Sequence, residues 1–263
     1  MKPYLWITYD HTSTSECLSM LDTILEQYPN HDIIHEIGRL TLLQATLKGV
    51  PIISEFRQRL DNDQTLVADF IEYDVPYGAE GRSYWRSYYT GTDLVTVMAT
   101  VPDEVIQEAI KSANTEQKRV AFDLMPCHDD HWKVKRAQEL ADLGASLISC
   151  HTGWSEPSTA KTSTALIEKV CQQLKNSSTQ VIAIGGFKPS NIKDLKPYIE
   201  QNQIFAIALS NTITLSKDPN AVIAQFLAEI NEQVDCARLK EFEPPQSKAD
   251  ANWAAIDQLT RHL

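Results

Sequence analysis

Residues 65–74 read Thr-Leu-Val-Ala-Asp-Phe-Ile-Glu-Tyr-Asp, an apolar run that ends in three carboxylates. Its first four residues are apolar or β-branched, which is typical of a strand covered on both faces. Asp69 then falls at the carboxyl end of the predicted strand, where α/β proteins carry their chemistry. Taken alone, the stretch leaves a second interpretation open, in which Asp69 and Asp74 only cap a following helix.

The same alternation of apolar runs and amphipathic helical patterns extends along the chain, and it predicts parallel strands joined by helices. We expect strands at 4–9, 33–38, 65–69, 94–98, 119–123, 146–151, 180–186 and 204–209. We expect helices at 15–28, 40–48, 52–60, 79–89, 102–113, 132–143, 164–174, 191–201 and 219–234. Eight such repeats predict a (β/α)8 TIM barrel over residues 1–234.

An open doubly wound sheet is the competing fold, but no G-x-G-x-x-G turn follows the first predicted strand. After position 234 the composition changes. Residues 235–263 indicate a linker with Pro244 and Pro245, then a short helix with Trp253, Ile256 and Leu259 on one face. We expect this C-terminal extension to pack on the barrel or on a neighbouring molecule.

Composition limits the partners. The formal net charge of −11 argues against nucleic acid and anionic membranes, because both bind basic surfaces. The five cysteines are odd in number and form no C-x-x-C pair, which indicates reduced thiols and a cytoplasmic protein. No stretch is long and apolar enough to span a membrane. A small-molecule substrate is therefore the expected partner.

Ionisable residues end most of the predicted strands. They are Asp10, Glu36, Asp69, Asp74, Asp123 and His151. In a barrel these strand ends converge on one mouth. Clustered carboxylates repel one another, so they must be protonated, hydrogen-bonded or paired with cations. Mg²⁺ is the expected neutralising ion, since it prefers oxygen ligands and keeps waters that a substrate can displace.

Several short segments support a more specific interpretation by their order and spacing. They are Asp10, 36–38, 66–69 followed by Asp74, 94–97, the strand that ends in Asp123, His151 and 185–186. Together they resemble the orotidine 5'-phosphate decarboxylase superfamily, most closely its branch of 3-keto-L-gulonate-6-phosphate decarboxylases and 3-hexulose-6-phosphate synthases. The resemblance covers almost the whole predicted barrel.

The resemblance implies a metal site and a shared active site. Glu36 and Asp69 would bind Mg²⁺, which acts as a Lewis acid and stabilises an enediolate. Asp74 would reach into the neighbouring subunit's site in a homodimer. His151 would help to deliver a proton to the intermediate.

The remaining site residues follow from the same resemblance. Asp10 and Asp123 would hold substrate hydroxyls. Asp123 would also be a catalytic residue, together with Asp69, Asp74 and His151. The family's phosphate grip joins a glycine pair to a Gly-Arg pair. Gly185 and Gly186 match the first pair, and Ser210 and Asn211 occupy the second.

The chain also departs from the family pattern. The motif lysine between Asp69 and Asp74 is replaced by Ile71, and a basic residue expected three positions after His151 is Trp154. Asn211 stands where the phosphate-binding arginine is expected. A charged hydrogen bond of that kind contributes about 1.5–3 kcal/mol, so the substrate could be unphosphorylated.

These observations favour a Mg²⁺-dependent carbon-carbon lyase of the decarboxylase or aldolase type. It would act on a sugar-acid or sugar-phosphate-like substrate through an enediolate intermediate. Two alternatives stay open: a barrel that has lost this chemistry and serves as a small-molecule binding or regulatory protein, and an epimerase or isomerase acting on a similar substrate.

Overall fold

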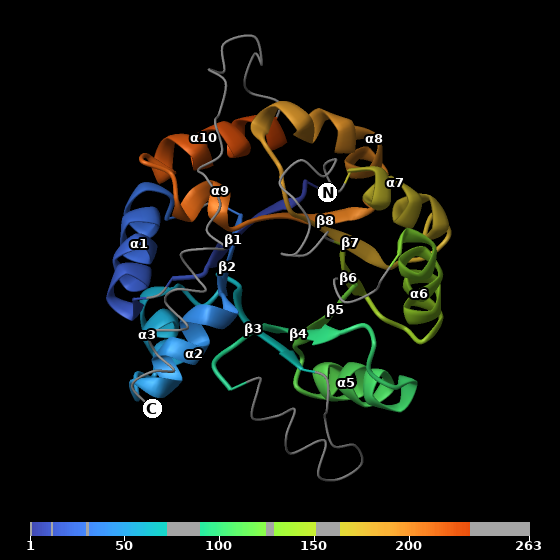
Figure 1. Ribbon diagram of the computed structural model, residues 1–263, viewed down its shortest axis with the longest axis horizontal. Coiled ribbons are helices and arrows are strands. Elements are labelled where there is room, and N and C mark those ends of the chain that lie inside the picture. Colours follow the sequence, from blue (N-terminus) through green and yellow to red (C-terminus); the bar gives the residue numbers. More distant parts are fainter. Residues whose placement is uncertain are drawn as a thin grey trace.

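The computed structural model describes residues 2–11, 13–29, 32–72, 90–124, 129–150 and 164–231, and at 71 and 72 it describes the backbone alone. Eight parallel strands close into a barrel in chain order, with β8 paired to β1. Helices surround the strands on the outside (Figure 1). The predicted TIM barrel is therefore confirmed. The C-terminal extension predicted at 235–263 lies outside the described residues.

The strands have the following bounds: β1 (Tyr4–Tyr9), β2 (Ile33–Ile37), β3 (Leu66–Glu72), β4 (Leu94–Met98), β5 (Arg119–Asp123), β6 (Leu147–Cys150), β7 (Gln180–Ile184) and β8 (Ile204–Leu209). The helices are α1 (Thr14–Gln27), α2 (Arg39–Leu47), α3 (Ile52–Arg59), α5 (Asp103–Thr115), α6 (Asp130–Asp142), α7 (Thr164–Gln173), the 3₁₀ helix η1 (Pro189–Leu195), α8 (Lys196–Glu200), α9 (Asn211–Thr214) and α10 (Pro219–Ile230).

Strand β3 is longer than its apolar run suggested. It continues to Glu72, so Asp69 lies within the strand and not at its end. The pairing of β3 with β4 shifts register between Ala68 and Glu72. Strand geometry therefore continues beyond the point where the hydrophobic signal stops.

Two helical segments also differ from expectation. The helix predicted at 191–201 forms as η1 followed by α8, with Pro197 in the first turn of α8. Proline has no N–H to donate, so a continuous α-helix through this position would lose a hydrogen bond. The short helix α9 was not predicted, because four residues carry no readable helical periodicity.

The apolar core has two parts. The larger part fills the layer between strands and helices. The smaller part fills the interior of the barrel with side chains from all eight strands: Trp6, Ile34, Val67, Leu94, Ala121, Leu147, Ile182 and Ala206. Small alanines on β5 and β8 leave room for the large Trp6 ring, so the interior is a packed plug and not a pore.

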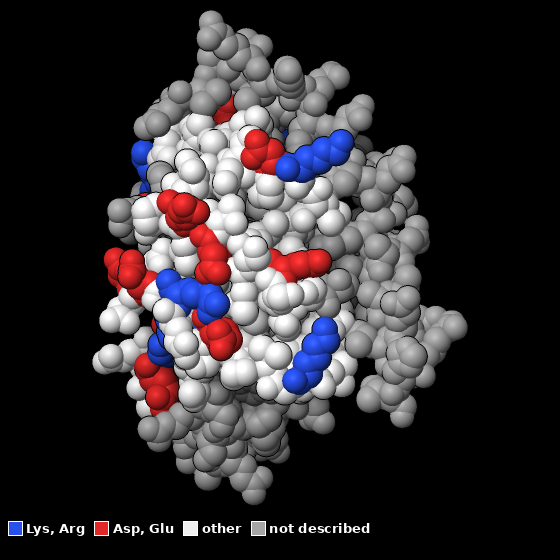
Figure 2. Space-filling view, turned by 90° about the vertical axis from the view of Figure 1, so that its left-hand side faces the viewer, with Lys and Arg blue, Asp and Glu red and all other residues white. Residues whose placement is uncertain are grey.

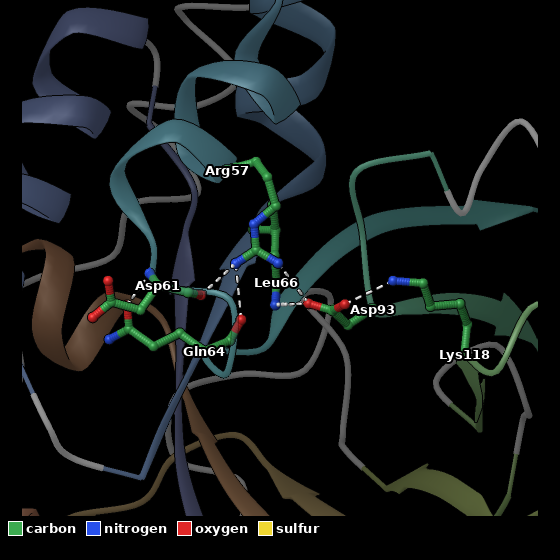
Figure 3. A network of polar contacts seen from close by, with 6 residues as sticks. All are labelled: Arg57, Asp61, Gln64, Leu66, Asp93 and Lys118. Carbon is green, nitrogen blue, oxygen red and sulfur yellow. Dashed lines mark hydrogen bonds and ion pairs between the residues drawn. The ribbon is translucent and has the colours of Figure 1, made fainter.

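A polar network closes the amino end of the barrel around Asp93, which precedes β4 (Figure 3). Its carboxylate accepts from Arg57 Nη1 at 2.9 Å, Lys118 Nζ at 2.8 Å and the Leu66 N–H at 2.9 Å. Partial burial opposes ionisation of Asp93, but these hydrogen bonds and the two positive charges hold its pKa below the usual range. Because it ties α3 to the starts of β3, β4 and β5, the network serves stability, as is typical of this end of a barrel.

The outer surface carries both signs of charge. On the side with α1 and α3, acidic and basic side chains are interspersed among uncharged ones over the described part of the face (Figure 2). None of the described helices combines the length and apolar character needed to cross a bilayer.

Candidate functional site

The barrel interior changes from apolar to polar toward the carboxyl ends of the strands. Side chains two positions apart on a strand point to the same face. Two positions beyond the apolar interior residues of β1 to β6 stand six polar ones: Thr8, Glu36, Asp69, Thr96, Asp123 and Ser149. These side chains form a polar layer at the mouth, directly above the apolar plug.

Glu36 on β2 is the best-defined member of this layer, and it is 7% exposed. Its Oε2 accepts hydrogen bonds from Trp6 Nε1, at 2.8 Å, and from the Thr8 hydroxyl. Burial raises the pKa of Glu36 well above its usual range, and the negative charge of Asp69 raises it further. The bonds from Thr8 and Trp6 oppose the shift, and the charge of Asp10 adds to it. The site therefore places carboxylates close enough to repel one another.

Asp69 on β3 is held from the neighbouring strand. The Thr96 hydroxyl on β4 donates to Asp69 Oδ1 at 2.6 Å. This contact fixes the carboxylate inside the mouth and on the same side as Glu36. The structure thus brings together the two residues predicted to bind a metal ion.

Asp10, which follows β1, has a structural partner. Its Oδ1 accepts from the Leu40 N–H at 3.0 Å and so holds the amino end of α2. A Cβ on Gly38 would lie 2.8 Å from the Asp10 Cβ and 2.9 Å from its Oδ1, so this turn requires glycine. Helix capping by Asp10 is shown, and its role in binding a substrate hydroxyl stays a prediction.

The second candidate region lies at the ends of β7 and β8, which are adjacent strands of the barrel. Gly185 and Gly186 adopt positive φ values of 96° and 67°. Ser210 and Asn211 begin the turn into α9, where the Ser210 carbonyl accepts from the N–H groups of Ile213 and Thr214, both at 2.9 Å. The four residues of the predicted phosphate grip therefore lie on neighbouring strand ends.

Of the other predicted site residues, the structure describes Asp123 and leaves several undescribed. Asp123 ends β5, is 5% exposed and belongs to the polar layer. Asp74, His151 and Trp154 lie outside the described residues, and so does the side chain of Ile71. Their predicted roles are not tested.

Four polar or aromatic residues at the site were missed by the sequence reasoning: Trp6, Thr8, Thr96 and Ser149. A signal for three of them existed. Residues two positions apart on a strand face the same side, so Thr8, two positions before Asp10, is expected to face the barrel interior. By the same period, Thr96 and Ser149 are expected to face the interior, because each follows an apolar strand residue by two positions. Trp6 could not be recognised as a donor to Glu36, because that contact joins two strands.

The donor set fits a hard divalent cation. Glu36 is buried and its neighbour Asp69 is partly buried, and their carboxylate oxygens are ligands that Mg²⁺ accepts. Within the described ranges, no group of three His, Cys, Asp or Glu residues could hold a metal ion. A Mg²⁺ ion bound by Glu36 and Asp69 would therefore complete its coordination with water or substrate, as is usual for this ion.

Comparison with known proteins agrees with this geometry. 3-Hexulose-6-phosphate synthase 2 of Staphylococcus saprophyticus is 28% identical over 170 residues, which cover 63% of this chain and 72% of that protein. The structure of 3-keto-L-gulonate-6-phosphate decarboxylase from Vibrio cholerae matches with a TM-score of 0.66 at 17% identity, over 89% of this chain and 100% of that one. Orotidine 5'-monophosphate decarboxylase from Methanocaldococcus jannaschii, complexed with the inhibitor BMP, matches with a TM-score of 0.64 at 17% identity, over 88% of this chain and 100% of that one.

No protein-family model matches the chain. The two structural matches, at this level of identity, show the shared barrel fold. The synthase sequence adds homology over most of its own length. The resemblance predicted from the strand-end motifs is therefore confirmed: the chain has 3-hexulose-6-phosphate synthases among its homologues, and it shares its barrel fold with a 3-keto-L-gulonate-6-phosphate decarboxylase and an orotidine 5'-monophosphate decarboxylase.

Proposed function

We propose that this protein is a Mg²⁺-dependent carbon-carbon lyase, of the decarboxylase or aldolase type, that acts on a sugar phosphate or sugar acid. The observation that carries the proposal is the pair of neighbouring carboxylates in the polar layer, buried Glu36 and partly buried Asp69. Burying like charges together is costly unless they have a use, and perturbed carboxylates in a barrel mouth are typical of active sites. The curated relative, a synthase of 3-hexulose 6-phosphate, supports the substrate class.

The roles follow from the position of each side chain. Mg²⁺ held by Glu36 and Asp69 would supply Lewis-acid stabilisation of negative charge on substrate oxygens. Asp10 and Asp123 border the same mouth and would orient hydroxyl groups. Cleavage of a carbon-carbon bond leaves an electron pair on the substrate as an enediolate, which then takes up a proton.

His151 and Asp74 are the proposed proton-handling groups, on the strength of the family resemblance. His151 immediately follows Cys150, the last residue of β6, and Asp74 follows β3 by two positions. Both therefore leave strands at the mouth end of the barrel. A homodimer in which Asp74 completes the partner's site is part of this proposal.

Turnover assays with purified protein test the proposal. We expect release of CO₂ from 3-keto-L-gulonate 6-phosphate or cleavage of 3-hexulose 6-phosphate, dependent on Mg²⁺ and abolished by a chelator. Glu36→Gln and Asp69→Asn should each lower kcat by at least about 100-fold. Glu26→Gln and Asp63→Asn change the same groups on exposed residues and should leave turnover unchanged.

The outcomes separate the proposed lyase from the alternatives. Exchange of solvent deuterium into the substrate without carbon loss would favour an epimerase or isomerase. Binding of sugar phosphates or sugar acids without any turnover would favour a binding or regulatory protein. Turnover that survives both Glu36→Gln and Asp69→Asn would show that this carboxylate pair is not the catalytic centre.

A further inference from the structure

Lys133 is a lysine with an almost wholly buried side chain at the mouth end of the barrel. It is the fourth residue of α6, which follows β5, so this turn of the helix lies at the same end as the polar layer. The residue is only 4% exposed. Its ammonium forms no hydrogen bond or ion pair with any other residue in the described ranges.

Arg136 provides a comparison within the same helix, one turn further along, and it is 8% exposed. Its guanidinium donates to two main-chain carbonyls at 2.8 and 3.2 Å and pairs with two carboxylates at 2.9 and 3.0 Å. Buried charges in proteins are normally paired in this way. Lys133 has no such pairing with the described residues, although both side chains are largely buried on one helix.

The surroundings of Lys133 place it beside the ends of β5 and β6. Cys150 is the last residue of β6, and burial raises the pKa of its thiol, with a further increase from Cys171. The positive charge of Lys133 lowers that pKa, and the negative charges of Asp123 and Asp130 raise it. Lys133 and the site residue Asp123 therefore lie within electrostatic range of one thiol.

The nearby carboxylates have other roles. Asp130 is half exposed, and its carboxylate forms an ion pair with Lys169 on α7 at 2.9 Å. Its negative charge is therefore already neutralised by another residue. Asp123 belongs to the polar layer that faces the substrate space. Among the described residues, no carboxylate forms an ion pair with the ammonium of Lys133, which is thus left for an anion from the substrate.

We propose that Lys133 binds the anionic group of the substrate, a phosphate or a carboxylate, at the β5 and β6 side of the mouth. This inference rests on the proposed function, because it names the group that holds the substrate in that site. It also accounts for two departures from the family pattern, since the cations expected at positions 71 and 211 are replaced by Ile71 and Asn211. A mouth rich in carboxylates needs a cation to hold an anionic substrate.

Titration calorimetry with two probes tests Lys133 and separates the two possible anions. D-Ribose 5-phosphate carries the phosphate and D-gluconate carries the carboxylate, and each is titrated in the presence of Mg²⁺. Lys133→Met should weaken binding of one probe by at least about tenfold. Lys135→Met, on the same helix with a 71% exposed side chain, is the matched control and should bind as the wild type does.

Thermal stability gives a second measurement. Lys133→Met keeps the apolar stem of the side chain and removes an ammonium that has no hydrogen bond or ion pair among the described residues, so the melting temperature should be unchanged and weaker binding cannot be explained by unfolding. If Lys133→Met does not fold, Lys133→Gln takes its place in the same titrations.

Each remaining outcome is decisive. Wild-type affinity for both probes in the neutral variant would overturn the proposal, and so would a wild-type protein that binds neither probe. Turnover by the wild type is measured separately. Binding that depends on Lys133 without turnover would keep the anion site and refute the lyase function.

Discussion

His35 should make the stability of this protein depend on pH. It lies on β2, is 1% exposed, and its Nδ1 is 2.9 Å from the Tyr9 hydroxyl, while its Nε2 is buried without a hydrogen-bond partner among the described residues. Burial, together with the positive charge of Arg57, lowers the pKa of His35 to about 3. The folded protein therefore keeps this imidazole neutral over most of the acidic range.

The magnitude follows from proton linkage. In the unfolded chain the pKa of histidine is about 6.5, so between these two values only the unfolded state binds the proton. The stabilisation is complete above about pH 6.5 and is lost as the pH falls toward the folded-state pKa. At about pH 5 the difference amounts to about 2 kcal/mol relative to about pH 7.5. This figure is insensitive to the folded-state value, because the folded protein is almost fully neutral at His35 at that pH.

Urea denaturation at the two pH values measures this effect. The variant His35→Gln keeps a polar group for the Tyr9 hydroxyl but does not titrate, so it is the reference. We expect the wild type to lose about 2 kcal/mol more unfolding free energy than the variant on going from about pH 7.5 to about pH 5. Other titrating groups affect both proteins equally. Parallel pH dependence in the two proteins would refute the assignment of a neutral, buried His35.

Three further substitutions test the described contacts by chemical denaturation. Asp93→Asn should lower the unfolding free energy by about 2 kcal/mol at neutral pH, and the difference should shrink below about pH 4, where the wild-type carboxylate gains its proton; an unchanged difference at low pH would contradict the charged network. Gly38→Ala should lower the unfolding free energy by about 1–3 kcal/mol, because the added Cβ would collide with Asp10. A variant as stable as the wild type would show that the backbone of this turn can shift to make room for the Cβ. Trp6→Phe removes a donor to the buried Glu36 and should cost about 1–3 kcal/mol, more at high pH where the carboxylate ionises, so a loss that is equal at all pH values would point to packing alone.

Much of the fold could be predicted because its signals are local. Strand β5 at Arg119–Asp123 and strand β8 at Ile204–Leu209 match the expected ranges, since each is a short apolar run bounded by polar residues. The end of β3 was misjudged because hydrogen bonding to β4 extends the strand beyond its apolar residues. The break between η1 and α8 was missed although Pro197 signals it.

The sequence by itself determined the order of strands and helices, the acidic strand ends and the family resemblance. These depend on residue type and spacing along the chain, which a barrel with regular connections converts into a ring of strand ends. Tertiary structure alone decided the contact of Trp6 with Glu36 and the hydrogen bond from Thr96 to Asp69, and it buried the side chain of Lys133 without an ion pair among the described residues. The physical reason is that desolvation and electrostatic coupling depend on which side chains meet across strands and helices, and no spacing along one chain specifies those meetings.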